Sequence, residues 1–338
     1  MKRQISLSSG LFLFAIGFVL SLLLVWLRTA RAHSQVSTAP KQTSKKNNCD
    51  VVSFRRGGYE LVKPLLYVEK ECESEEMAPV KIAANEVINK FKASNDITTA
   101  AIYIRDLEKS SWIGINENEP FHPASLFKVP NLMAYLHKAQ LDPTLLDQEY
   151  LFEPPPRGVI PPQNYLGNSI EPGKKYSVRQ LLHYTIAESD NNAHWLLHQK
   201  IDYAMFNKVF QDINLSIPIA DPQDSMYRIS AREYSVFFRT LYNASYLSPD
   251  MSSYALSILS ETKFAEGFLA GFPPGTKVAH KFGEHDNGID CELHESGIIY
   301  VKGKAYLITI MTAGKTRTKL PNVLATLAQT IYKTMFEP

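Results

Sequence analysis

Residues 122–130 read HPASLFKVP, and Ser125 to Lys128 within them form an S-x-x-K string. Residues three apart on a helix share a face, so Lys128 is placed to take the proton of the Ser125 hydroxyl. Pro123 precedes the string, which puts Ser125 near the amino terminus of a helix expected over 125–140. The string predicts a serine nucleophile with a lysine base. The alternative is an N-cap serine and a surface lysine.

A second string, Ser189-Asp190-Asn191, falls between helices expected over 178–188 and 192–200. We expect the Ser189 hydroxyl to carry a proton to the leaving group and the Asn191 amide to contact polar groups of the substrate. Asp190 is expected to brace the turn. The alternative is a plain capping turn, since all three residue types favour caps and turns.

The third string, Lys281-Phe282-Gly283, ends a strand expected over 278–282. Lys281 would supply a charge for an anionic substrate. The pKa of Lys128 must fall for it to act as a base, and both burial and a neighbouring cation such as Lys281 would lower it. Gly283 would allow close approach of a substrate backbone.

No single string is sufficient evidence for a catalytic site, because residues 260–263 read SETK, a second S-x-x-K to which we assign no chemistry. The evidence is the occurrence of all three strings in this order. Hydrophobic periodicity predicts strands over 98–105, 112–116, 278–282, 297–301 and 306–312, and helices over 80–91, 125–140, 178–188, 192–200, 231–242 and from Pro321 onward. Strands at both ends with helices between them predict a mixed α/β (α+β) fold, a sheet built from distant segments with a helical subdomain inserted. The site would lie at their junction.

Together these strings resemble the penicillin-recognising serine enzymes, above all the class A β-lactamases, whose pattern is S-x-x-K, S-D-N and K-[ST]-G in that order. Residues 116–130 (NENEPFHPASLFKVP) resemble the family's approach to its nucleophile, and residues 187–197 its S-D-N junction. The resemblance extends from about Pro79 to the carboxyl terminus. It implies a β-lactamase/transpeptidase-like fold, with an antiparallel sheet flanked by helices and an inserted all-helical subdomain.

The resemblance also implies roles for individual residues. Ser125 would be the acylated nucleophile, with Lys128 and Ser189 as proton-transfer partners. Lys281 would bind the substrate carboxylate. The backbone N–H groups of Ser125 and Glu284 would form the oxyanion hole.

One departure from the family concerns deacylation. Class A enzymes carry an E-x-x-L-N motif whose glutamate activates water, and residues 189–232 contain no glutamate. The corresponding stretch, 217–228, offers only Asp221 and Asp224, while Glu233 is expected at position N3 of a helix capping box. Losing a positioned base costs about 10²- to 10⁴-fold in rate, so we expect slow release of the acyl group.

A second departure is Phe282, which replaces a Ser or Thr hydroxyl. A carboxylate that lacks one charge-assisted hydrogen bond loses roughly 1.5 to 3 kcal/mol. The candidates to replace it are His280, His285 and His294, each of which has a structural or exposed alternative.

Residues 4–27 contain no charged side chain, and the stretch is long enough to cross a bilayer core of about 30 Å. We favour an uncleaved anchor, although residues 30–32 (ARA) loosely match a signal cleavage site. The expected division is an anchor or signal segment (1–31), a flexible linker (32–58), an extended lead-in (59–78) and the catalytic domain (79–338). The domain is expected outside the cytoplasm, on a single-pass anchor or secreted if cleaved.

The formal net charge of +2 gives no reason to expect a nucleic-acid partner, and the acidic run 69–76 is expected to be solvated. Cys49, Cys72 and Cys291 lack the spacing of a metal site, so no metal or cofactor is expected. Outside the cytoplasm, Cys49 and Cys72 would form a disulfide and leave Cys291 free. The alternative is three unpaired thiols.

We therefore expect a serine hydrolase of the class A β-lactamase type that acts on a β-lactam or related amide through an acyl-serine. One alternative is a penicillin-binding D,D-peptidase that acts on peptidoglycan peptide. Another is a non-catalytic sensor of wall fragments or β-lactams.

Overall fold

The computed structural model of the chain describes residues 49–57, 64–160, 163–165, 167–218, 227–286 and 288–337. The predicted anchor lies outside the described residues, as do Asp221 and Asp224. No helix within the described ranges has the length and apolar character needed to cross a bilayer.

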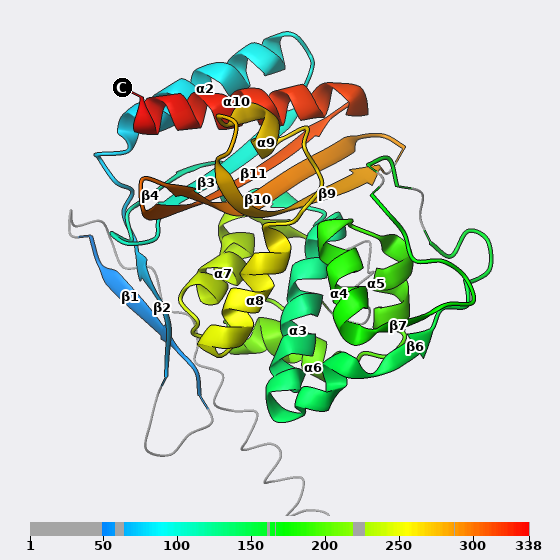
Figure 1. The fold of residues 1–338 in the computed structure, drawn as a ribbon. Helices are drawn as coiled ribbons and strands as arrows, with labels where there is room; N and C mark the ends of the chain where they lie inside the picture. The colour runs from blue at the N-terminus through cyan, green and yellow to red at the C-terminus, as the bar shows by residue number, and fades with distance from the viewer. Residues whose placement is uncertain are drawn as a thin grey trace, which may run out of the picture. The chain divides into compact units, whose positions relative to one another are not determined.

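A five-stranded antiparallel sheet forms the centre of the fold, with the strand order β4-β3-β11-β10-β9 (Figure 1). Its strands are β3 (Thr99–Asp106), β4 (Trp112–Ile115), β9 (Lys277–Asp286), β10 (Cys291–Val301) and β11 (Lys304–Gly314). Lys302 and Gly303, with φ of 51° and 76°, make the two-residue turn between β10 and β11. Strands from both ends of the chain thus meet in one sheet, as predicted, and β9 lies at one edge.

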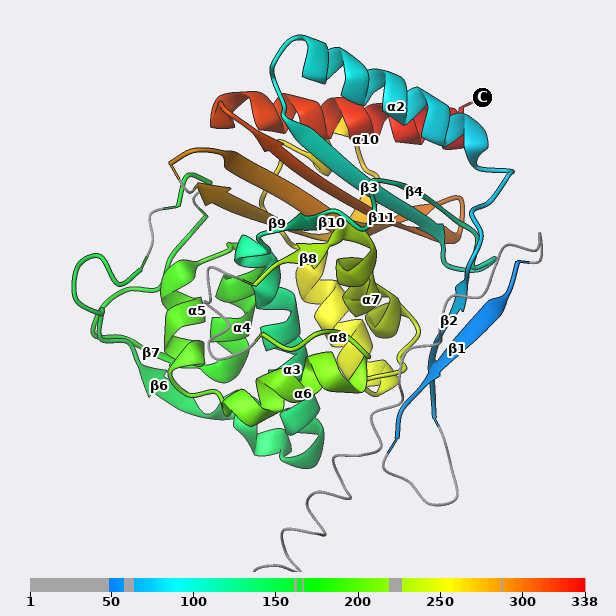
Figure 2. The same cartoon turned by 180° about the vertical axis from the view of Figure 1, so that it is seen from behind.

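Helices cover both faces of the sheet (Figures 1 and 2). One face carries α2 (Ala78–Ala93), α9 (Phe268–Gly271) and α10 (Leu320–Phe336); the other carries α3 (Lys128–Leu141), α4 (Val178–Ala187), α5 (Asn191–His198), α6 (Tyr203–Asp212), α7 (Ala231–Tyr242) and α8 (Pro249–Leu259). Alternate residues of β3 enter two separate cores, Ile102 and Ile104 toward α2 and α10, Ala101 and Tyr103 toward the helical lobe. The expected helical subdomain beside an antiparallel sheet is confirmed.

Short elements connect these layers. They are β5 (Pro120–Phe121) paired with β8 (Ile229–Ser230), β6 (Glu149–Leu151) paired with β7 (Lys175–Ser177), and the 3₁₀ turns η1 (Ala124–Phe127), η2 (Pro143–Asp147) and η3 (Arg317–Lys319). The predicted capping box of α7 is present, because Glu233 accepts from the Ser230 backbone N–H at 2.9 Å.

A hairpin precedes α2. Its strands are β1 (Val51–Arg55) and β2 (Leu65–Lys70), and a disulfide joins Cys49 to Cys72. Cys291 is free and buried, so the disulfide prediction is confirmed. The structure places β1 inside the range predicted as flexible linker, which therefore does not extend through residues 51–55.

The acidic run was expected to be solvated, and for Glu69 this is wrong. Glu69 is 7% exposed and accepts from Arg105 Nη1 at 3.0 Å and from Arg239 Nη1. Both guanidinium groups also donate to the Val68 carbonyl at 2.8 Å. A buried carboxylate with two buried arginines is retained because each charge compensates the other. This network joins β2 to β3 and α7.

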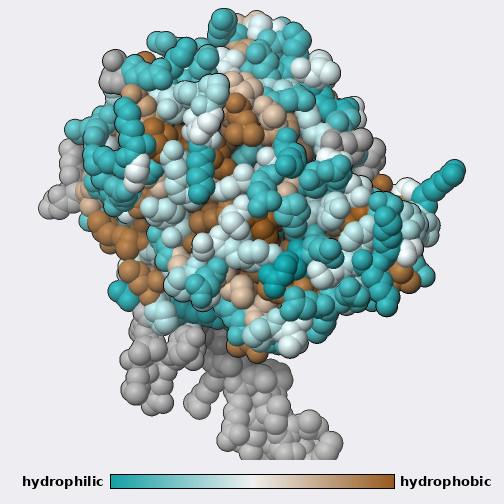
Figure 3. Space-filling model, viewed as in Figure 1, coloured by the Kyte–Doolittle hydropathy of each residue, from teal (hydrophilic) through white to brown (hydrophobic). Residues whose placement is uncertain are grey.

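The face seen in Figure 3 is largely hydrophilic, with apolar residues in separate patches between polar ones. Large exposed hydrophobic side chains include Leu141 and Ile289. Single exposed apolar residues of this kind are ordinary for a folded domain.

Candidate active site

Ser125 lies in the 3₁₀ turn η1, immediately before α3, rather than in the α-helix predicted over 125–140. The preceding Ala124 has a φ of 50°, and its backbone N–H donates to His122 Nδ1 at 3.1 Å. The Leu126 carbonyl accepts from the Tyr234 hydroxyl at 3.0 Å. Ser125 caps neither η1 nor α3. The N-cap alternative is therefore excluded, and η1 is fixed on both sides of the serine.

Lys128 is buried, with 1% of its surface exposed, so it is not the surface lysine of the alternative interpretation. Its Nζ donates to Asn191 Oδ1 at 2.6 Å and to the Ser189 carbonyl at 2.7 Å, and lies 3.3 Å from Ser189 Oγ. Burial lowers the pKa of Lys128 to about 7, against the opposing charges of Asp190 and Glu284. A lysine with this pKa can be neutral near pH 7 and accept a proton.

Ser189 is fully buried in the turn between α4 and α5, in the left-handed region with φ of 54°. Strained backbone of this kind is frequent at functional sites. Asp190 is the N-cap of α5 and accepts from the Asn192 and Ala193 backbone N–H groups at 2.9 and 3.3 Å. The capping role thus belongs to Asp190, as predicted, while Ser189 and Asn191 contact Lys128.

Lys281 approaches the same hydroxyl from β9. Its Nζ donates to Ser189 Oγ at 2.8 Å and to the Phe282 carbonyl at 3.0 Å. Burial, and next the charge of Lys128, lower the pKa of Lys281 well below its ordinary value. If both buried amines around this hydroxyl were protonated, two like charges would lie close together away from water, which is energetically unfavourable. We predicted that burial and the charge of Lys281 lower the pKa of Lys128; burial is confirmed as the cause, and Lys281 is not among the causes.

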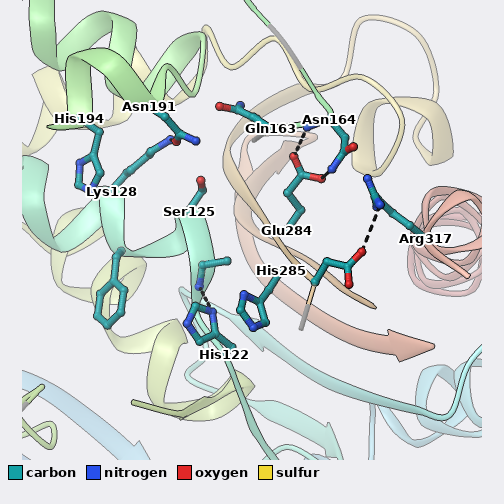
Figure 4. Close-up of a pocket in the computed structure, with 13 residues that line it drawn as sticks. His122, Ser125, Lys128, Gln163, Asn164, Asn191, His194, Glu284, His285 and Arg317 are labelled. Atoms are coloured by element: carbon teal, nitrogen blue, oxygen red, sulfur yellow. Dashed lines mark hydrogen bonds and ion pairs between the residues drawn. The ribbon is translucent and has the colours of Figure 1, made fainter. Parts of the chain in front are cut away.

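A cavity of about 530 Å³ opens beside Ser125 (Figure 4). It is lined by His122, Ala124, Ser125, Phe127, Lys128, Gln163, Asn164, Asn191, His194, Glu284, His285, Asp286 and Arg317. Four of the seven predicted site residues therefore line it, and Figure 4 shows Ser125 between the Lys128–Asn191 pair and Glu284. The other three, Ser189, Lys281 and Gly283, are not among the residues that line the cavity. The functional roles of all seven residues stay predictions.

Gly283 is required for close packing of β9 against η1. A Cβ at this position would lie 2.8 Å from the Pro123 carbonyl oxygen and 3.1 Å from the Leu126 backbone nitrogen. Such short contacts with backbone cannot be relieved by a side-chain rotation. The close approach is thus to the chain on either side of Ser125, whereas we had expected a substrate backbone there.

We predict that Gly283→Ala lowers the free energy of unfolding by about 1 to 3 kcal/mol, because the added methyl overpacks the contact with η1. It should also slow any acylation of Ser125 by displacing that turn. Urea unfolding monitored by circular dichroism measures the first effect. Gly57→Ala is the matched control, since a Cβ there meets nothing within 4 Å. Equal stability of the two variants would contradict the prediction.

Sequence reasoning missed several cavity-lining residues. His122 and His285 stack with ring centroids 3.8 Å apart, and burial lowers the pKa of His122 to about 4. His194 is one turn after Asn191 on α5, so helical spacing from the S-D-N string could have identified it. Gln163 carried no sequence signal.

The three histidines proposed to compensate for Phe282 have separate environments. His285 lines the cavity. His280 pairs with buried Glu295 at 2.6 Å. His294 is buried, with Nε2 3.1 Å from the His122 carbonyl oxygen. Only His285 is placed to contact a substrate. No group of three or more histidine, cysteine or acidic side chains within the described ranges could hold a metal ion.

The model of the β-lactamase enzyme family matches residues 82–335 of this chain. Among solved structures, a PBP-A mutant described as an acyl-enzyme complex with penicillin G aligns with a TM-score of 0.64 and 20% identity, over 76% of this chain and 97% of that one. A β-lactamase from Chitinophaga pinensis aligns with a TM-score of 0.64 and 20% identity, over 75% and 99% of the two chains. The TLA-3 extended-spectrum β-lactamase aligns with a TM-score of 0.65 and 16% identity, over 76% and 99%. None of the curated proteins matches the sequence.

Proposed function

The chain belongs to the β-lactamase enzyme family, and from that membership we propose a serine hydrolase of the class A type that acylates Ser125 with β-lactams or related amides. One observation carries the proposal. Lys128 and Lys281 converge on the Ser189 hydroxyl directly behind the cavity that Ser125 lines. This arrangement supplies a base and a proton path at a candidate nucleophile.

In the proposed reaction the Ser125 oxygen attacks the amide carbonyl carbon while its proton passes to neutral Lys128. The backbone N–H groups of Ser125 and Glu284 would stabilise the oxyanion. When the C–N bond breaks, the Ser189 hydroxyl donates its proton to the leaving nitrogen and is reprotonated by a lysine. Water then cleaves the acyl-serine ester, so that one amide and one water give one amine and one carboxylic acid.

Deacylation requires a base that activates water near the acyl-serine. The carboxylates that line the cavity in the described part of the chain are Glu284 and Asp286. Glu284 accepts from Asn164, and Asp286 pairs with Arg317 at 3.2 Å. Neither is poised as a free base for water. This observation favours, as the second candidate, a penicillin-binding D,D-peptidase that acts on peptidoglycan peptide and releases a penicilloyl group slowly.

Intact mass of the full-length chain, followed over time after mixing with penicillin G, tests the proposal. A transient adduct is the result expected of a hydrolase. A persistent adduct would favour the D,D-peptidase or the non-catalytic sensor instead. No adduct at all would remove β-lactams from the substrates considered.

We also propose that the catalytic domain lies outside the cytoplasm on a single N-terminal anchor. The Cys49–Cys72 disulfide supports an oxidising compartment, and the uncharged residues 4–27 support an anchor. Protease digestion of intact cells tests this location, and a fully protected domain would contradict it.

A further inference from the structure

Residues 163–165 and 167–170 are the described parts of one stretch of the chain, and they contact the K-F-G strand and the S-D-N turn respectively. Its residues 168–170 are held at the turn, where Glu188 accepts from the Asn168 backbone N–H at 2.9 Å and Asp190 accepts from that of Ile170 at 3.0 Å. Its residues 163–165 reach β9. The described parts of this stretch thus contact the turn that contains Ser189 and the strand β9 that carries Lys281.

At β9 the segment is held by charge and by aromatic packing. Both oxygens of the Glu284 carboxylate accept from Asn164, one from its backbone N–H and one from Nδ2, each at 2.7 Å (Figure 4). The Tyr165 ring packs edge-on against Phe264 at 4.9 Å and Phe282 at 5.7 Å, and these two phenylalanines stack at 4.3 Å. We call Asn164, Tyr165 and their three partners the bridge.

The bridge accounts for the phenylalanine at position 282. Where the family pattern has a hydroxyl, this chain has a ring that is 2% exposed and packs against Tyr165 rather than facing the cavity. A serine or threonine could not make this contact. Phe282, which removes a hydroxyl from the expected carboxylate site, therefore belongs to an aromatic cluster with Phe264 and Tyr165.

The position of the bridge matters because β9 is an edge strand. A free edge pairs readily with an extended peptide, and the proposed oxyanion hole uses the Glu284 backbone N–H, so an extended substrate must lie beside that residue. The Glu284 side chain is tied to Asn164 at that point. A compact acylating group can instead reach Ser125 through the cavity that the serine already lines.

Resting on the proposed function, we propose that the bridge determines substrate specificity at this site. It admits compact amides to Ser125 and opposes substrates extended along β9, which must displace Tyr165 and Asn164. Each aromatic pair contributes roughly two- to tenfold to an equilibrium constant, so removing the Tyr165 ring, which makes two such pairs, should ease displacement by about tenfold.

The test uses the full-length chain with Tyr165→Ala and, as the matched control, Tyr165→Phe, which keeps the ring. Second-order rate constants of adduct formation are measured by intact mass with two β-lactams. Penicillin G, with its acylamino side chain and carboxylate, is the extended probe, and a monocyclic azetidinone that carries no side chain or carboxylate is the compact one. We expect Tyr165→Ala to react about tenfold faster with penicillin G and within about twofold of the parent with the azetidinone. Tyr165→Phe should match the parent with both probes.

An unchanged or slower reaction of Tyr165→Ala with penicillin G would overturn the proposal, and so would an equal gain with both probes. Binding of penicillin G in a Ser125→Ala background separates this proposal from the proposed function. A tenfold lower Kd after adding Tyr165→Ala supports the bridge even if Ser125 is never acylated. An unchanged Kd contradicts the bridge whether or not acylation occurs.

Discussion

Ser125→Ala is expected to abolish the penicillin adduct, with a loss of at least about 10⁴-fold in the acylation rate constant. Ser125 provides the single side-chain hydroxyl among the described residues that line the cavity. No other hydroxyl among these lining residues can therefore replace it as the nucleophile. The measurement is intact mass after mixing with penicillin G, with the melting temperature as a check that the variant folds.

The chain contains its own control for this variant. Ser260 begins the second S-x-x-K string, but it is the C-cap of α8, and its hydroxyl donates to the Leu256 carbonyl at 2.8 Å. Ser260→Ala should form the adduct at the parental rate. An adduct that survives in Ser125→Ala, or disappears in Ser260→Ala, would refute the assignment of the nucleophile.

Lys128→Met is expected to lower the acylation rate constant by about 10²- to 10⁴-fold, the usual contribution of a positioned base. Methionine fills a similar volume without an amine, although it leaves the Ser189 carbonyl and Asn191 Oδ1 without this donor. Melting temperatures must therefore accompany the kinetics. Lys263→Met removes the exposed lysine of the second string and should have no effect.

The pH profile separates a base from a merely structural lysine. Only neutral Lys128 can accept the proton, and its pKa is lowered to about 7. The acylation rate should therefore rise as the pH increases through about 7 and level off above it. The inflection should be absent in Lys128→Met. A parental profile that stays flat across this pH range would contradict a lysine base with so low a pKa.

Much of the fold could be predicted because periodicity and caps are local signals. The helix over 231–242 and its Glu233 capping box required only neighbouring residues, and the terminal helix was marked by Pro321. The hairpin of β1 and β2 was missed, although its disulfide was predicted, because the contacts that hold it to the domain run from Glu69 to Arg105 and Arg239, which are distant in sequence.

The candidate site was predictable to the extent that its residues fall in motifs. The strings identified the residues that converge on Ser189, and burial lowers the pKa of Lys128, as the role of a base required. The extent of that burial comes from tertiary packing, which no local pattern indicates. Phe282 was interpreted only as a lost hydroxyl. Its contact with Tyr165 joins residues 117 positions apart, and no local pattern indicates it (282 − 165).

The disulfide that closes the hairpin also determines how mechanical tension would travel through the domain. A pull on the chain at Cys49 passes through the covalent bond directly to Cys72, so β1 and β2, which lie within the closed loop, are bypassed. The next contact is Glu73, which pairs with Lys81 of α2 and accepts from the Gly114 backbone N–H of β4. Because β4 and β9 are opposite edges of the sheet, a load that enters through Glu73 reaches the β4 edge, which is the edge away from β9.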